Sequence, residues 1–186
     1  MYIVDILLQT RLILWRGQKH SGKTTAAGRL IEQARKEGFN VAGLLAPAVY
    51  SGGRLLGFDL INLRTGGRVA LAETKKTNSG NGPFNLEDAG LRFGAEALKP
   101  DKVKEAELII IDEFGPLELA GGGWRRNVDS LLRSTGALIL LVVRDELVET
   151  VENIYQDIPA GVLAALEPSS TAEVVQMLIH IRQQSQ

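Results

Sequence analysis

Short apolar segments alternate along the chain with longer segments in which apolar residues recur every three or four positions. The first pattern is typical of buried strands and the second of amphipathic helices. Strands are expected at residues 3–8, 12–15, 41–46, 106–111, 137–143 and 162–166. Because these segments are apolar without alternation, they predict a mostly parallel sheet that is covered on both faces by helices.

Helices are expected at residues of about 22–37, 85–100 and 124–134, from Asp145 onward, and at about 171–182. Gly38 follows the first of them, where a glycine commonly ends a helix. Asn85 is expected to cap the second helix, and Pro100 is expected to stop it.

The region after Pro47 changes in character. Two turn sequences, Ser51-Gly52-Gly53 and Thr65-Gly66-Gly67, flank residues 54–63, and a further apolar segment follows at 68–72. This pattern predicts an antiparallel β-meander inserted into the α/β chain. Residues 75–83 are polar and are expected to form an exposed loop.

Length and composition limit the classes of function. The 186 residues fit one domain spanning 1–186, without an internal repeat or a linker. The net charge of −1 argues against a nucleic-acid partner. Without cysteine the chain has neither thiolate catalysis nor cysteine-ligated zinc. No apolar run approaches the roughly 18 residues of a membrane span, and no basic leader is present, so we expect a cytoplasmic protein with no membrane partner.

A phosphate-binding loop is predicted between the strand at 12–15 and the helix that follows. The run Gly17-Gln18-Lys19-His20-Ser21-Gly22-Lys23-Thr24 has a glycine, four residues and then Gly-Lys-Thr. Backbone N–H groups of such a loop, together with the helix N-terminus, bind phosphate oxygens. The predicted nucleotide-binding residues are Gly17, Gln18, Lys19, His20, Ser21, Gly22, Lys23, Thr24 and Thr25.

Two side chains of this loop carry specific chemistry. Lys23 can reach the β- and γ-phosphates as a fixed cation and is a candidate catalytic residue. The hydroxyl of Thr24 can ligate Mg²⁺. His20 can touch phosphate, although a lone loop histidine is usually incidental.

An acidic pair, Asp112-Glu113, follows the apolar segment 106–111. Asp112 is a candidate for the Mg²⁺ site, usually through water, and Glu113 is a candidate base that prepares the attacking water. An acidic pair after a strand is also common as the solvated start of a loop. The phosphate loop in the same chain favours the catalytic interpretation.

Together these residues resemble the additional-strand class of P-loop ATPases, in which a glutamate directly follows the metal-associated aspartate. The run Ile111-Asp112-Glu113-Phe114-Gly115-Pro116-Leu117-Glu118-Leu119 is similar to the THEP-type nucleoside-triphosphatases, which include a human cancer-related member. The likeness covers residues of about 12–143. It implies a three-layer, RecA-like P-loop NTPase fold with a mostly parallel mixed sheet. It also implies slow, Mg²⁺-dependent hydrolysis of ATP, GTP and other nucleoside triphosphates, with little base preference.

Two further residues are weaker candidates for catalysis. Glu118 matches an acidic position of that family and can either brace the water or be a plain surface carboxylate. Arg144 follows the apolar segment 137–143, where open α/β sheets place ligands. It can act as an arginine finger, or form an ion pair with Asp145 or near Glu146.

Other functions share the phosphate loop. A small-molecule kinase commonly has an arginine-containing lid, and the only candidate lid, residues 75–84, contains no arginine. A nucleotide-gated switch or assembly factor would have the same motifs with little turnover of its own. A nucleic-acid-stimulated ATPase is disfavoured by the charge. A guanine-specific GTPase is disfavoured because no Asn-Lys-x-Asp motif is present. Protein partners are unknown from the sequence.

Overall fold

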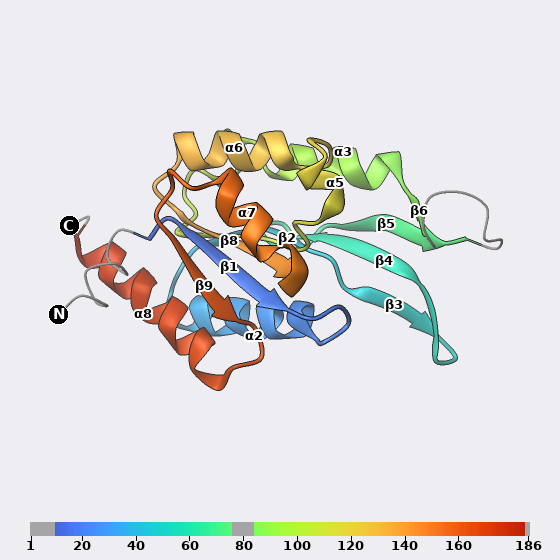
Figure 1. Ribbon diagram of the computed structural model, residues 1–186, viewed down its shortest axis with the longest axis horizontal. Helices are drawn as coiled ribbons and strands as arrows, with labels where there is room; N and C mark the ends of the chain where they lie inside the picture. The colour runs from blue at the N-terminus through green and yellow to red at the C-terminus, as the bar shows by residue number, and fades with distance from the viewer. Residues whose placement is uncertain (1–9, 76–83, 185–186) are drawn as a thin grey trace.

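The computed structural model describes residues 10–75 and 84–184, which form one mixed sheet with helices on both faces (Figure 1). The strands are β1 Leu12–Gly17, β2 Val41–Leu45, β3 Ala48–Ser51, β4 Arg54–Asn62, β5 Arg68–Thr74, β6 Phe84–Leu86, β7 Leu108–Ile111, β8 Leu138–Arg144 and β9 Ala160–Ala164. The helices are α2 Lys23–Lys36, α3 Asp88–Ala97, α4 Pro100–Val103, α5 Pro116–Leu119, α6 Arg125–Ser134, the short 3₁₀ turn η1 Asp145–Leu147, α7 Val148–Ile154 and α8 Pro168–Gln184. The predicted three-layer α/β fold is confirmed.

The order of strands across the sheet is β6-β5-β4-β2-β7-β8-β1-β9, and β3 pairs with β4. Neighbours among β2, β7, β8, β1 and β9 are parallel. Strands β3 to β6 pair antiparallel and extend one side of the sheet, which confirms the predicted meander. Strand β8 lies between β1, which leads into the phosphate loop, and β7, which leads into the acidic pair. This is the added strand expected from the resemblance.

Two hydrophobic clusters fill the spaces on either side of the sheet. One includes residues of α6 and α7, and the other includes residues of α2 and α8. In β7, Ile109 and Ile111 belong to the first cluster, while Leu108 and Ile110 belong to the second. Successive side chains of a strand point to opposite faces, which explains why this strand is apolar throughout.

Some predicted boundaries were wrong. Asn85 does not cap a helix: it lies in β6, because residues 84–86 pair with β5, and the N-cap of α3 is Glu87. Pairing with β1 places the last strand two residues earlier than predicted, at Ala160–Ala164. The last helix begins at Pro168, and Pro100 begins α4, since proline suits the first position of a helix. The predicted strand at 3–8 and most of the loop at 75–83 lie outside the described residues.

Within the described ranges, no helix is long and apolar enough to cross a membrane.

Gly43 gives a test of how closely β2 and β7 pack. Its φ is +110°, and a Cβ added there would lie 2.0 Å from the carbonyl oxygen of Ile110 on β7. We expect Gly43→Ala to lower the free energy of unfolding by at least about 3 kcal/mol, measured by urea denaturation. Gly28 on α2 is the matched control, because a Cβ there meets nothing within 4 Å. Gly28→Ala should raise stability by about 0.5–1 kcal/mol. Equal stability of Gly43→Ala and the wild type would contradict the described pairing.

Candidate active site

The phosphate loop lies where β1 ends and α2 begins. Gly17 is the last residue of β1, and Gly22 is the N-cap of α2. The loop is therefore at the carboxyl edge of the parallel strands, where open α/β sheets bind ligands. The first turn of α2 contains no acidic residue, so the positive end of the helix dipole is not neutralised there.

Polar groups of the loop are buried at this helix end. Lys23 is only 6% exposed, and its Nζ donates a hydrogen bond to the carbonyl oxygen of Gln18 at 2.9 Å. The hydroxyl of Ser21 is buried and, among the described residues, has no hydrogen-bond partner. Buried polar atoms normally find a partner, and the oxygens of a bound phosphate would provide acceptors for both side chains.

Asp112 follows β7 and is brought against the phosphate loop. Asp112 is 1% exposed, its carboxylate accepts a hydrogen bond from the N–H of Ala46 at 3.1 Å, and the side chain of Thr24 lies beside it. Burial raises the pKa of Asp112 to about 6, although the neighbouring Thr24 and Ala46 act in the opposite direction. The two predicted magnesium ligands therefore lie in contact, in a place where a buried carboxylate lacks a full counter-charge.

These two residues fit a magnesium ion that is shared with a nucleotide. A hydroxyl and a carboxylate supply the oxygen ligands that Mg²⁺ prefers, while water and phosphate complete its shell. Over residues 10–75 and 84–184, no group of three or more His, Cys, Asp or Glu side chains could hold a metal ion by itself. A site of this kind depends on phosphate oxygens for the remaining ligands.

The raised pKa of Asp112 leads to a prediction for stability. An acid whose folded-state pKa exceeds its ordinary value of 3.8 costs stability when it is ionised, and this cost disappears as the pH falls from about 6 toward 4. We expect Asp112→Asn to raise the free energy of unfolding of the nucleotide-free protein by about 1–3 kcal/mol at pH 8. Urea denaturation in a chelator would measure this. The gain should shrink at pH 5, and a variant less stable than the wild type at pH 8 would contradict it.

Glu113 is held by Arg144 on the neighbouring strand β8. The Nε of Arg144 lies 2.6 Å from Oε1 of Glu113, and both side chains are about one-third exposed, at 27% and 33%. The ion pair predicted between Arg144 and Asp145 was wrong, because Asp145 pairs with Arg16 at 3.1 Å. The actual pair could not be expected from the sequence pattern, because its residues are 31 positions apart. The arginine-finger role of Arg144 stays a prediction.

Glu118 is buried, so the alternative that it is a plain surface carboxylate was wrong. It is 4% exposed and accepts hydrogen bonds from the backbone N–H groups of Gly115 at 2.9 Å and Trp124 at 3.3 Å. A Cβ at Gly123 would lie 2.0 Å from its Oε1, so the glycine at 123 makes room for the carboxylate. Glu118 thus fastens the loop at 121–123 to the start of α5, and its predicted part in catalysis remains untested.

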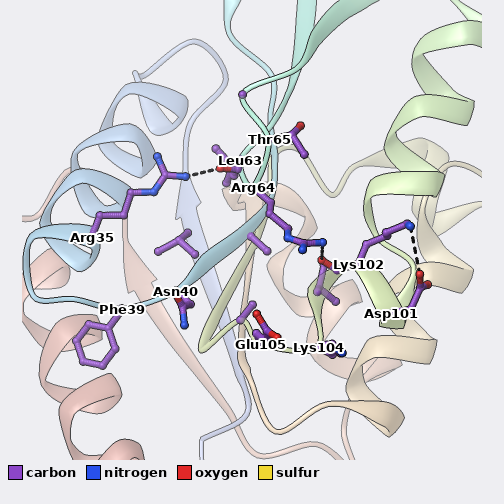
Figure 2. A pocket seen from close by; sticks show the side chains of 15 residues that line it. Arg35, Phe39, Asn40, Leu63, Arg64, Thr65, Asp101, Lys102, Lys104 and Glu105 are labelled. Atoms are coloured by element: carbon purple, nitrogen blue, oxygen red, sulfur yellow. Dashed lines mark hydrogen bonds and ion pairs between the residues drawn. The ribbon is translucent and has the colours of Figure 1, made fainter.

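A cavity of about 520 Å³ lies away from these residues, near the amino ends of β2 and β7 (Figure 2). Arg64 crosses its wall and donates to the carbonyl oxygen of Lys102 at 2.9 Å, and Arg35 donates to that of Leu63. None of the residues predicted for nucleotide binding or catalysis lines this cavity. The phosphate loop is therefore the better place for the chemistry, since it contains the buried Lys23 and the buried hydroxyl of Ser21, and the buried Asp112 lies against it.

Comparison with known proteins agrees with this geometry. A family model described as NTPase matches residues 13–175. The chain belongs to this NTPase family. The match includes the phosphate loop, the acidic pair and β8, so the residues discussed above lie within the family's shared region.

Several relatives cover most of the chain. It is 35% identical over 135 residues to "Nucleoside-triphosphatase THEP1" of Methanothermobacter thermautotrophicus, covering 73% of this chain and 78% of that protein. It is 30% identical over 167 residues to the protein of that name from Pyrococcus abyssi, covering 89% of each. The solution structure of a human cancer-related nucleoside triphosphatase has a TM-score of 0.68 at 21% identity, covering 96% of this chain and 99% of that one. THEP1 from Aquifex aeolicus has the same TM-score at 17% identity, covering 91% and 98%. These two structures support the fold.

Proposed function

We propose that this protein hydrolyses nucleoside 5′-triphosphates to diphosphate and phosphate, with Mg²⁺ bound by Thr24 and, through water, by Asp112. The observation that carries the proposal is the group of buried polar side chains at this edge of the sheet: the lysine Lys23, the unpartnered hydroxyl of Ser21 and the carboxylate of Asp112, which follows β7 and lies beside the loop. Membership of the NTPase family supports it, as do the names of the THEP1 relatives. Bound Mg²⁺ would neutralise negative charge on the β- and γ-phosphates.

The protein's own residues have separate tasks in this proposal. Loop N–H groups and Lys23 bind the phosphates and stabilise the charge that develops during transfer. Glu113, next to Asp112 and at the surface of the site, orients a water molecule and accepts its proton. The products are a nucleoside diphosphate and inorganic phosphate, with the proton leaving through Glu113.

The choice of base is a further prediction. No base-reading motif was found in the sequence, so contacts to phosphate and metal should dominate affinity. We expect kcat/KM for ATP, GTP, CTP and UTP to agree within about tenfold, or roughly 1.4 kcal/mol. Phosphate release at matched nucleotide concentrations would measure this, and a thousandfold preference for one base would reveal a specific pocket.

The same assay distinguishes the proposed hydrolase from two other functions. A small-molecule kinase would transfer the phosphate to a component of a cell extract, and a nucleotide-gated switch would release almost none without a partner. The proposed hydrolase releases inorganic phosphate from purified components alone. Adding extract to the assay and following labelled γ-phosphate separates the three.

A further inference from the structure

The topology of the sheet brings Arg144 between the two halves of the site. On one side, the last residue of β1, Gly17, is in register with Arg144. On the other side, the N–H of Phe114 donates to the carbonyl oxygen of Val142 at 2.8 Å, so the segment carrying Glu113 continues alongside β8. The backbone of Arg144 is therefore fixed by strand pairing, and its side chain reaches the carboxylate of Glu113.

Apart from Arg144, the charged groups around Glu113 either repel it or are hydrogen-bonded elsewhere. The negative charge of Glu113 contributes to raising the pKa of both Asp112 and Glu118, so these two acidic groups repel its carboxylate. Lys23, the nearby cation of the phosphate loop, donates to Gln18 instead. Among the described residues, Arg144 is the one cation within ion-pair distance of Glu113.

We propose that Arg144 is a positioning residue that acts on turnover through Glu113, by holding its carboxylate beside the start of the phosphate loop. This inference rests on the proposed function of Glu113 as the base that prepares water. An ion pair that is about one-third exposed is partly screened by solvent and contributes little to stability, about 0–1 kcal/mol, so the pair is poorly suited to a purely structural role. A base, in contrast, must lie within hydrogen-bond reach of its water, and small displacements of it are costly to the rate.

The test is a double-mutant cycle on single-turnover rates with saturating Mg²⁺–ATP. Arg144→Gln should lower the rate by about 10- to 100-fold, with KM nearly unchanged, and Arg144→Lys should restore part of it. In a Glu113→Gln background, Arg144→Gln should change the remaining rate by less than about twofold, because the group through which it acts is already gone. The melting temperatures of Arg144→Gln and the wild type should agree within a few degrees.

Arg16 offers a matched control at the same edge of the sheet. It precedes Gly17 and, within the described part of the chain, forms its ion pair with Asp145 at 3.1 Å and not with Glu113. Arg16→Gln should leave the rate close to that of the wild type.

Three results would overturn the inference. A rate loss from Arg144→Gln that is as large in the Glu113→Gln background as in the wild type would mean that Arg144 acts on phosphate directly, as an arginine finger. A wild-type rate in Arg144→Gln would remove any role in turnover, and an equal loss in Arg16→Gln would show a general effect of charge. Failure of the proposed function looks different: Glu113→Gln alone would then turn over as fast as the wild type.

Discussion

Lys23→Ala should lose nearly all hydrolysis, with a fall in kcat/KM of at least about 10²–10³-fold. Lys23 begins α2, is almost fully buried, and its ammonium lies within the phosphate loop, where Nζ donates to the carbonyl oxygen of Gln18. Removing it deletes a fixed cation from the place where the β- and γ-phosphates would bind. Both binding and the transition state use this charge, so nucleotide affinity should fall as well.

The fold should survive this change. A buried ammonium is costly to desolvate, and over residues 10–75 and 84–184 the ammonium of Lys23 is hydrogen-bonded within the loop itself, to Gln18. The circular dichroism spectrum should therefore match that of the wild type, and the free energy of unfolding from urea denaturation should agree within about 1 kcal/mol. Lys36→Ala, in the exposed last turn of the same helix, is the control for loss of a positive charge. Wild-type hydrolysis in a folded Lys23→Ala protein would contradict the phosphate-loop assignment.

Glu113→Gln should lower the single-turnover rate by about 10²–10⁴-fold, the usual contribution of a positioned general base. Glutamine keeps the size and the hydrogen-bonding reach of glutamate but cannot accept the proton of the attacking water. Nucleotide affinity should hardly change, because the loop and the Thr24–Asp112 pair are intact. Rapid-quench measurement of phosphate release, together with a titration of nucleotide binding, gives both quantities.

Two comparison variants sharpen this result. Asp112→Asn should weaken the Mg²⁺-dependent part of nucleotide binding as well as the rate, because it alters a proposed metal ligand. Glu146→Gln replaces an exposed acid in η1 and should behave like the wild type. If Glu113→Gln hydrolysed as fast as the wild type, Glu113 would have no part in the mechanism, and a nucleotide-gated switch would become the better interpretation.

The phosphate loop and the acidic pair could be predicted because their signals are local. Each motif directly follows an apolar strand, and parallel strands bring their carboxyl ends to one edge of the sheet. The sequence pattern does not encode the order of strands across the sheet. It is the position of β8 between β1 and β7 that brings Arg144 to Glu113, so this contact could not be found from spacing alone.

The role of Glu118 was missed although a local signal existed. Gly115-Pro116-Leu117-Glu118 has proline at the first helical position and glutamate at the third, a common arrangement at a helix N-terminus. Asn85 shows the opposite error, because its good capping residue type was overridden by pairing of β6 with β5. Propensity is a weak signal where strand pairing competes with it.

The most direct test of the central claim follows labelled γ-phosphate from ATP in a single turnover, with purified protein in excess. With Mg²⁺ present, the label should appear as inorganic phosphate, and Lys23→Ala or a chelator should suppress that release. Two results would contradict Mg²⁺-dependent hydrolysis at this phosphate loop. In the first, the label stays on the nucleotide in the wild type, as it does in Lys23→Ala. In the second, the label is released equally with and without the chelator.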